Sequence, residues 1–319
     1  MDFGVQLVPV TSFVNQKNYS AVIVGDHFQD RALLKQFREL TCPKYLIAEE
    51  VPFLLPDNYA PERTREYNLV FTWREDLVDD KKYIYNFSLF PDTQMARIIR
   101  ESDFPISMKA KKVYVGSAKK DIAANSLYGF RRDLIEWFNK HKPSEIDLYG
   151  AKWDRYYFRG SSLGAKFLNW RRIDMFFNGL NKNTQRIYKG KIKSKYFELK
   201  KYRFQFCLEN GFGYPGYVTE KLFDAMICRN VPVYKPTDDV SVSKIVPKDV
   251  FINMNDFESF EDLNSHLNSL SDDDVAAYLM AAEKFLEHLP EFLRPDYASG
   301  RVAQRIIRDL AGGVEIKGA

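Results

Sequence analysis

Short apolar runs alternate with longer amphipathic stretches along most of this chain. The first third contains three apolar runs of strand length, at residues 21–25, 45–48 and 68–72. Residues 30–40, between the first two runs, have the spacing of an amphipathic helix. A second series follows, with a strand at 113–116, a helix at 126–141 and a strand at 146–150. This alternation is typical of parallel sheets whose strands are joined by crossover helices, so the pattern predicts an α/β protein.

The clearest strand–helix–strand pattern lies in the second half of the chain. It consists of a strand at 202–208, a loop at 209–218, a helix at 219–228 and a strand at 231–234. A strand near 250–253 and a helix at 272–288 follow it. Residues 102–112 are polar and contain Pro105, which predicts a domain boundary. We therefore expect two α/β domains, at 1–107 and 108–290, facing each other across a cleft, with a C-terminal helix or tail at 291–319.

The loop at 209–218 is the most informative segment. Its three glycines and one proline lie between a strand and a helix, where the backbone can approach a ligand closely. Thr219 is a favourable N-cap, and Glu220 and Lys221 occupy the first helical turn. A helix N-terminus beside a lysine suits a phosphate, and Glu220 suits the ribose hydroxyls of a nucleotide. The alternative is an ordinary helix start with solvated charges.

Arg131 falls inside the apolar stripe of the predicted helix 126–141. Leu127, Phe130 and Leu134 mark that stripe, whereas Arg132 lies on the polar side. An arginine turned inward needs an anionic partner or a route to water for its head group. Arg131 therefore either extends to solvent from the start of the helix or binds the diphosphate of a ligand.

Two adjacent carboxylates, Glu49 and Glu50, end the apolar run at 45–48 just before Pro52. Strand ends are where α/β folds present catalytic groups. Neighbouring carboxylates in a half-buried setting raise at least one pKa, as a general base working near neutrality requires. The alternative is a pair of strand-end charges that point to water.

Composition and charge exclude several classes of protein. Apolar residues make up 45% of the 319 residues and aromatic residues 15%, so a disordered chain is excluded. The net charge is 47 − 43 = +4, which is not that of a polycation that coats nucleic acid. The 3 cysteines are too few and scattered for a disulfide framework, and the 4 histidines lack metal-ligand spacing. No apolar run is long enough to span a membrane. We expect no metal and a cytoplasmic protein.

Two further segments resemble functional motifs. Asp272 to Asp274 resembles a metal-binding Asp-x-Asp, but Ser271 and Asp274 are spaced as a capping box, which is the favoured interpretation. The segment from Arg186 to Arg203 contains eight basic and four aromatic side chains. A solvated face is the favoured interpretation, and peripheral contact with an anionic membrane stays open. We expect no nucleic-acid binding.

The second half of the chain resembles glycosyltransferase family 10, the α-1,3/4-fucosyltransferases, in a bacterial or viral form. The resemblance rests on Phe204-Gln-Phe-Cys-Leu-Glu209-Asn210, Gly216-Tyr217-Val-Thr-Glu220-Lys221 and Val231-Pro-Val-Tyr234. It extends over about residues 110 to 290. In the first domain it is carried only by the Glu-x-Pro at Glu50 and by Thr72-Trp73. Asn230 replaces a glycine that the family commonly has before Val-Pro-Val.

The resemblance implies a GT-B fold, with two Rossmann-like domains, and an inverting transfer of fucose from GDP-fucose without a metal. By matching position, Arg131 and Lys221 would stabilise the diphosphate and Glu220 would hold the ribose. Asn210 and Tyr217 would line the donor pocket, and Glu50 or Glu49 would be the general base. The acceptor would be a glycan that contains N-acetylglucosamine, for a surface polysaccharide. Two alternatives stay open: a related transferase with another GDP-sugar or acceptor, and a non-catalytic nucleotide- or glycan-binding protein.

Overall fold

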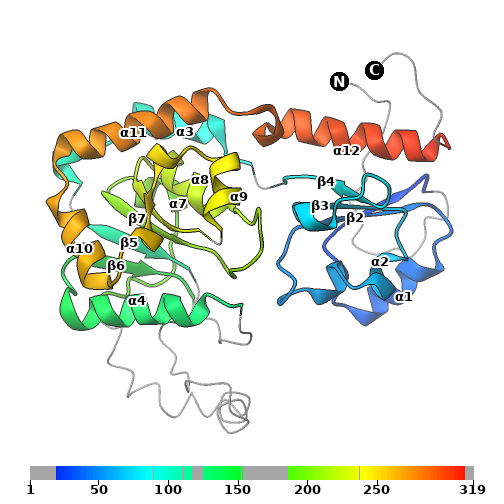
Figure 1. Ribbon diagram of the computed structural model, residues 1–319, viewed down its shortest axis with the longest axis horizontal. Coiled ribbons are helices and arrows are strands. Elements are labelled where there is room, and N and C mark those ends of the chain that lie inside the picture. The colour runs from blue at the N-terminus through cyan, green and yellow to red at the C-terminus, as the bar shows by residue number, and fades with distance from the viewer. Residues whose placement is uncertain are drawn as a thin grey trace, which may run out of the picture. The chain divides into compact units, whose positions relative to one another are not determined.

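The computed structural model describes residues 19–88, 90–109, 111–116, 125–151, 153, 186–236 and 238–312. The chain divides into two compact units (Figure 1). Unit 1 consists of Met1–Phe90 and Pro290–Ala319, and unit 2 of Pro91–Leu289. Every strand and helix predicted from the pattern is present, with ends that differ by no more than two residues. Both units are α/β structures with parallel sheets, as predicted.

Unit 1 contains a parallel sheet in the order β1-β2-β3-β4. Its strands are β1 (Val22–Gly25), β2 (Lys44–Ala48), β3 (Leu69–Thr72) and β4 (Tyr83–Tyr85), and its helices are α1 (Arg31–Glu39), α2 (Pro61–Thr64) and α12 (Pro295–Leu310). One face of the sheet packs through Leu46 and Val70 against Phe37 of α1. Because side chains alternate along a strand, Tyr45 and Phe71 point to the other face, which α12 covers (Figure 1).

Unit 2 contains a second parallel sheet, in the order β6-β5-β7-β8-β9. Its strands are β5 (Lys112–Val115), β6 (Ile146–Tyr149), β7 (Phe204–Leu208), β8 (Val231–Lys235) and β9 (Ile252–Asn253). Its helices are α3 (Thr93–Glu101), α4 (Tyr128–His141), α7 (Lys195–Leu199), α8 (Glu220–Ile227), α9 (Asp239–Ile245), α10 (Phe260–Ser269) and α11 (Asp272–Glu287). Short 3-10 helices lie at Pro56–Asn58, Glu75–Leu77 and Glu291–Leu293 in unit 1 and at Ile106–Met108, Lys248–Val250 and Met254–Asp256 in unit 2.

Helices cover both faces of the sheet in unit 2. Phe206 of β7 packs with Phe138 of α4 on one face. Cys207, the next residue along the strand, points the other way and donates to the carbonyl of Lys221 in α8 at 3.2 Å. Figure 1 shows α4 on one side of the sheet and α8 with α3 on the other. The fold is therefore doubly wound, and β5 lies between β6 and β7.

The division between the units differs from the predicted boundary at residues 107 and 108. Helix α3 packs against α8 and α11, so the chain already belongs to unit 2 from Pro91 onward. At the other end, the predicted tail contains α12, which returns to unit 1. Val302 and Ile306 of this helix pack against Phe71, and Tyr45 donates from its hydroxyl to Asp309 at 2.8 Å. Burial of an apolar helix face, rather than local polarity, decides both limits.

Candidate active site

The carboxyl ends of β5 and β7 form the first candidate region. Helix α4 follows β5, helix α8 follows β7, and the sheet order reverses between these two neighbouring strands. Ligands of doubly wound folds bind outside the carboxyl ends of the strands at such a reversal. The N-terminal halves of α4 and α8 carry Arg131 and Lys221, respectively. The topology therefore places two of the predicted phosphate-binding residues beside the same switch point.

Glu209 is a fully buried carboxylate at the end of β7. One of its oxygens accepts from the Thr219 backbone at 2.9 Å and from the Tyr234 hydroxyl at 3.1 Å. The other accepts from the Thr219 hydroxyl at 2.6 Å and lies 3.5 Å from the Lys221 ammonium. A buried carboxylate is stable only with such partners. Glu209 therefore fixes the start of α8 and its lysine to the end of β7.

Lys221 extends from the first turn of α8 and is partly exposed, at 22% of its side chain. Its ammonium donates to the Thr219 hydroxyl at 2.9 Å and lies 3.5 Å from Glu220. Burial on its own would lower the pKa of Lys221, but the Glu209 and Glu220 carboxylates raise it above its ordinary value. Lys221 is therefore positively charged at neutral pH, and Thr219 and Glu209 hold its ammonium group in place.

Glu220 is the exposed neighbour of Lys221 at the N-terminus of α8. Burial of the carboxyl tends to raise its pKa, but the Lys221 and Lys195 charges outweigh this and lower it. Glu220 is therefore an ionised hydrogen-bond acceptor at neutral pH, as its expected role toward ribose hydroxyls requires.

Arg131 is buried, with 3% of its surface exposed, as its place in the apolar stripe predicts. It donates to the Leu208 carbonyl at 2.6 Å and to the Asn210 side-chain oxygen at 3.1 Å. Its guanidinium lies 4.7 Å from the centre of the Tyr128 ring. Within the described residues it has no carboxylate partner, and its Nε has no hydrogen-bond acceptor. A buried guanidinium without a counter-charge indicates a place for an anion.

Tyr114 of β5 adds a second unsatisfied group beside Arg131. Its ring is fully buried, and its hydroxyl finds no hydrogen-bond partner among the described residues. Burial raises the pKa of Tyr114, while the charges of Arg131 and Lys221 oppose that change. The two cations therefore act on the same tyrosine. Gly116 is required here because a side chain at that position would meet the Tyr114 hydroxyl.

The two remaining predicted donor residues lie in the same loop. Asn210 accepts from Arg131 through its side chain, and its carbonyl accepts from the Leu127 backbone at 3.0 Å. The loop after β7 is thereby joined to the start of α4. Tyr217 is buried, with 3% exposed, close before the N-cap of α8. The glycines beside it, Gly213 and Gly216, have φ angles of 75° and 79°, which favour glycine.

Glu49 and Glu50 lie in unit 1, directly after β2, and both are half-buried. One oxygen of Asp26, the residue after β1, organises their backbone. It accepts from the Glu49 and Glu50 backbone at 2.8 and 3.1 Å and from Asn58 at 2.7 Å. The carbonyl of Glu49 accepts from the Trp73 indole at 2.9 Å. The structure therefore holds the two carboxylates at the carboxyl edge of the first sheet.

Sequence reasoning missed three residues of these two edges. Glu209 was noticed only as part of the signature, although a carboxylate that ends a fully buried strand is an available signal. Asp26 also follows a strand, and its φ of 58° is a conformation that aspartate adopts more readily than most residues. Tyr114 carries no sequence signal, because any large residue in a buried strand fits the same pattern.

Several polar side chains of the basic segment from Arg186 to Arg203 pair with acidic residues of unit 2. Lys195 pairs with the buried Asp224, and Tyr202 donates to Asp147 at 2.9 Å. Arg203 pairs with Asp272 at 2.6 Å.

The expected capping box of Ser271 and Asp274 is present at the start of α11. In the described part of the chain, no group of acidic, histidine or cysteine side chains is arranged to hold a metal ion. The described helices include none that is long and apolar enough to cross a membrane.

Comparison with known proteins shows which protein family the second half of the chain resembles. Residues 161–281 match the model described as glycosyltransferase family 10 (fucosyltransferase) C-term. This part of the chain is similar to family 10. The match includes β7, the Gly/Tyr loop and α8, and therefore contains Glu209, Asn210, Tyr217, Glu220 and Lys221. The sequence resemblance to the family is confirmed, and residues 161–185 of the match lie outside the described residues.

Curated relatives are similar over parts of their length. The alpha-(1,3)-fucosyltransferase FucT of Helicobacter pylori is 28% identical over 179 residues, which are 51% of this chain and 37% of the relative. The human 4-galactosyl-N-acetylglucosaminide 3-alpha-L-fucosyltransferase FUT5 is 37% identical over 98 residues, which are 30% of this chain and 24% of the relative. The chain thus matches less than two thirds of either relative.

Solved structures resemble the chain in fold. An α1,3-fucosyltransferase with GDP-fucose has a TM-score of 0.55 at 16% identity and covers 95% of this chain and 82% of its own. The trehalose-phosphate synthase (UDP-forming) of Burkholderia vietnamiensis has a TM-score of 0.54 at 8% identity and covers 92% of this chain and 74% of its own. With the two parallel α/β sheets, this confirms the predicted GT-B fold class.

Proposed function

We propose that this protein is an inverting α-1,3-fucosyltransferase that uses GDP-β-L-fucose. The observation that carries the proposal is the pairing of Arg131 and Lys221 at the switch point of the second sheet. Arg131 is a buried cation without a carboxylate partner in the described residues, and Lys221 is a held cation that reaches solvent. Two such charges suit the diphosphate of a nucleotide-sugar. The family match over 161–281 and the fucosyltransferase relatives support fucose as the sugar.

The proposed chemistry is a single displacement at the anomeric carbon of fucose. An acceptor hydroxyl attacks that carbon, the bond to the GDP oxygen breaks, and the configuration changes from β to α. Glu50 or Glu49 takes the hydroxyl proton as the new bond forms. Arg131 and Lys221 stabilise the negative charge that develops on the departing diphosphate, without a metal. Glu220 binds the ribose, and Asn210 and Tyr217 line the donor pocket.

The acceptor is proposed to be a glycan that contains N-acetylglucosamine. The printed name of the human relative, a 4-galactosyl-N-acetylglucosaminide transferase, supports this class of acceptor. The two glutamates lie in unit 1, so we assign acceptor activation to this unit and donor binding to unit 2. Cytoplasmic location and peripheral membrane contact through the segment from Arg186 to Arg203 remain predictions.

Calorimetric titration of the purified protein with GDP, GDP-fucose and GDP-mannose, with a chelator present, tests the donor assignment. We expect GDP and GDP-fucose to bind and GDP-mannose to bind more weakly. Lys221→Ala and Arg131→Ala should each weaken GDP binding about 10- to 100-fold, because each removes a charged hydrogen-bond donor. Lys140→Ala and Arg97→Ala are matched controls, since both residues are exposed and lie outside the site.

The outcomes separate the alternatives. Equal binding of GDP-mannose would favour a related transferase with a different donor. GDP binding without transfer to N-acetyllactosamine, unchanged when the acceptor is varied, would favour a non-catalytic binding protein. If GDP does not bind with or without Mg²⁺, the functional proposal is wrong and only the fold remains.

A further inference from the structure

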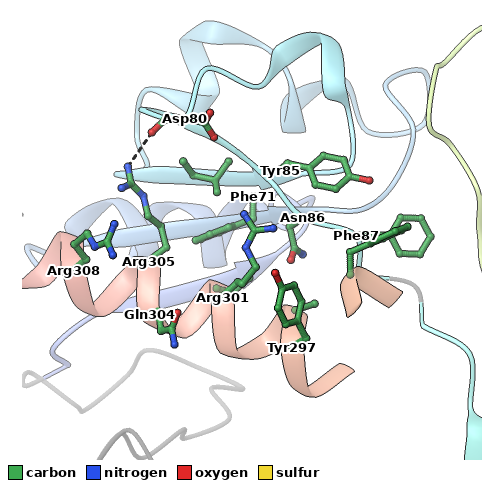
Figure 2. A pocket seen from close by; sticks show the side chains of 14 residues that line it. Phe71, Asp80, Tyr85, Asn86, Phe87, Tyr297, Arg301, Gln304, Arg305 and Arg308 are labelled. Atoms are coloured by element: carbon green, nitrogen blue, oxygen red, sulfur yellow. Dashed lines mark hydrogen bonds between the residues drawn. The ribbon is translucent and has the colours of Figure 1, made fainter. Parts of the chain in front are cut away.

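A pocket of about 280 Å³ lies within unit 1, between the edge strand β4 and helix α12. Its lining includes neither Glu49 nor Glu50. We call it the arginine pocket and define it by Phe71, Asn86, Tyr297, Arg301, Arg305 and Arg308. Figure 2 shows these side chains, with Arg301 lying among Phe71, Asn86 and Tyr297. No proposed step of fucosyl transfer uses this pocket.

The packing of α12 explains why the arginines line one pocket. Val302 and Ile306, four residues apart, pack onto the first sheet and fix the rotation of the helix. Arg301, Arg305 and Arg308 follow the spacing i, i+4, i+7 and therefore share one face beside that apolar stripe. Helix packing therefore places the three arginine side chains in the lining of one pocket beside β4.

The positive charge of the pocket is not balanced by carboxylates. Arg305 is held by two backbone carbonyls, those of Asp80 at 3.2 Å and Lys81 at 3.4 Å. Among the described residues, neither Arg301 nor Arg308 forms an ion pair or a hydrogen bond. Asp80 is the one acidic residue in the pocket lining. Three arginines and a single carboxylate in one lining create a site of positive potential.

Asn86 and Arg305 together give a second indication of a ligand. This residue is 8% exposed, and its side-chain amide makes no hydrogen bond within the described residues. In the same lining, the Arg305 Nε is buried and has no hydrogen-bond acceptor among the described residues, and a buried donor without a partner costs free energy unless something else satisfies it. Asn86 lies beside Arg301 and the Tyr297 ring in Figure 2. Buried donors are normally satisfied, so the Arg305 Nε, together with the nearby Asn86 amide, points to a hydrogen-bonding occupant of the pocket.

We propose that the arginine pocket binds an anionic sugar, through a phosphate or carboxylate held by Arg301 and its neighbours. Guanidinium groups bind both anions in bidentate geometry. Asn86 supplies the donor and acceptor that a sugar hydroxyl needs. Phe71, Tyr297 and Tyr85 supply apolar ring surface for the sugar carbons. The pocket volume is at the lower limit of small-molecule sites and suits a single sugar residue.

The test uses the full chain and four probes: glucose 6-phosphate, glucuronate, neutral glucose and inorganic phosphate. Binding is measured by calorimetry and by saturation-transfer NMR in the millimolar range. We expect at least one of the two acidic sugars to bind saturably and more tightly than both glucose and inorganic phosphate. Arg301→Gln and Asn86→Ala should each weaken this binding at least about 10-fold.

Two further variants separate the pocket from other sites. Arg97→Gln removes another exposed arginine, from α3, and should leave binding unchanged. Lys221→Ala should also leave it unchanged, because that lysine belongs to the proposed GDP site. This result would stand even if the protein fails to bind GDP. Arg308→Gln is a second variant of the pocket and should also weaken binding of the acidic sugar. Because Arg308 is exposed, this substitution should not affect folding.

Three results would overturn the proposal. They are the absence of saturable binding by both acidic sugars, binding that survives Arg301→Gln and Asn86→Ala, and equal affinity for inorganic phosphate and glucose 6-phosphate. The last result would show an anion site that does not recognise a sugar. Thermal unfolding of each variant shows whether a loss of binding follows from a loss of folded protein.

Discussion

The carboxyl edges of the two parallel sheets hold their functional groups in different ways. At the edge of unit 2, the side chains themselves are fixed: buried Glu209 holds Thr219 and Lys221, and Asn210 accepts from Arg131. At the edge of unit 1, Asp26 holds the backbone of Glu49 and Glu50, and the Glu50 carboxylate accepts from the Val51 backbone at 3.1 Å. Side chains therefore hold one another at the edge of unit 2, whereas at the edge of unit 1 one carboxylate orders the backbone of the following strand end.

The largest expected effect is on catalysis in unit 1. The double variant Glu49→Gln/Glu50→Gln should lower kcat by about 10²- to 10⁴-fold, because it removes the proposed base for the acceptor hydroxyl. The GDP dissociation constant and the Tm should stay close to the wild-type values. Initial rates with GDP-fucose and N-acetyllactosamine measure kcat, and the two single variants identify the base. Unchanged turnover in the double variant would remove both glutamates from the mechanism.

The next effect is on stability in unit 2. Glu209→Gln places an amide donor against groups that already donate to Glu209, and it leaves Lys221 without its buried counter-charge. We expect the free energy of unfolding to fall by about 1–3 kcal/mol, measured by urea denaturation. Glu258→Gln, at an exposed position on the same unit, is the matched control. If Glu209→Gln costs no more than this control, the fixed side chains of this edge are not held through Glu209.

A smaller effect should separate positioning from chemistry in unit 1. Asp26→Ala removes the oxygen that accepts three hydrogen bonds and places alanine at a φ of 58°. We expect kcat to fall about 10-fold with a smaller change in KM, because the glutamate backbone is no longer held. Asp26→Asn keeps an acceptor oxygen and tolerates this φ, so it should restore most of the rate. An equal loss in both variants would contradict a positioning role through this oxygen.

The smallest effect concerns the pH dependence of unit 1. His27 is buried, and burial lowers its pKa below the ordinary 6.5, although Asp57 and Glu66 oppose this. A lowered pKa means that the folded protein prefers neutral His27, so its stability is greatest above pH 6.5 and falls as the pH decreases. Tm should therefore drop between pH 7 and 5, and less steeply in His27→Gln. His288→Gln, at an exposed histidine, should keep the wild-type slope.

The hydrophobic pattern of the sequence predicted the strands and helices whose apolar residues are mostly buried. It missed elements, such as β4 and α3, whose place in the fold depends on contacts with distant segments. The strands at 204–208 and 231–235 are almost wholly buried, so their apolar runs were unambiguous. Strand β4 has only three residues and lies at a sheet edge, where alternation is too brief to detect. Helix α3 ends directly before the polar region 102–112 that suggested a boundary, but its contacts with α8 and α11 join it to unit 2.

The candidate site was predictable residue by residue, but its supporting network was not. Arg131 could be recognised because a charge inside an apolar stripe is a local anomaly. Thr219, Glu220 and Lys221 could be recognised because a helix start has a local signature. Glu209 and Asp26 act on residues that follow them by 10 and 23 positions, through hydrogen bonds that no local pattern reports. The arginine pocket likewise depends on contact between β4 and the distant helix α12.

The sequence by itself determined the α/β class, the family signature and the residues that end each strand. These properties follow from local periodicity and from turn and capping chemistry, which neighbouring residues decide together. The tertiary structure alone decided that β5 lies beside β7, which brings Arg131 and Lys221 to one switch point. It also decided that α12 belongs to unit 1, where it covers the sheet and assembles the arginine pocket. Strand order and helix docking depend on burial of apolar surface between segments that are far apart in the chain. Local sequence patterns do not report which distant segments pack together.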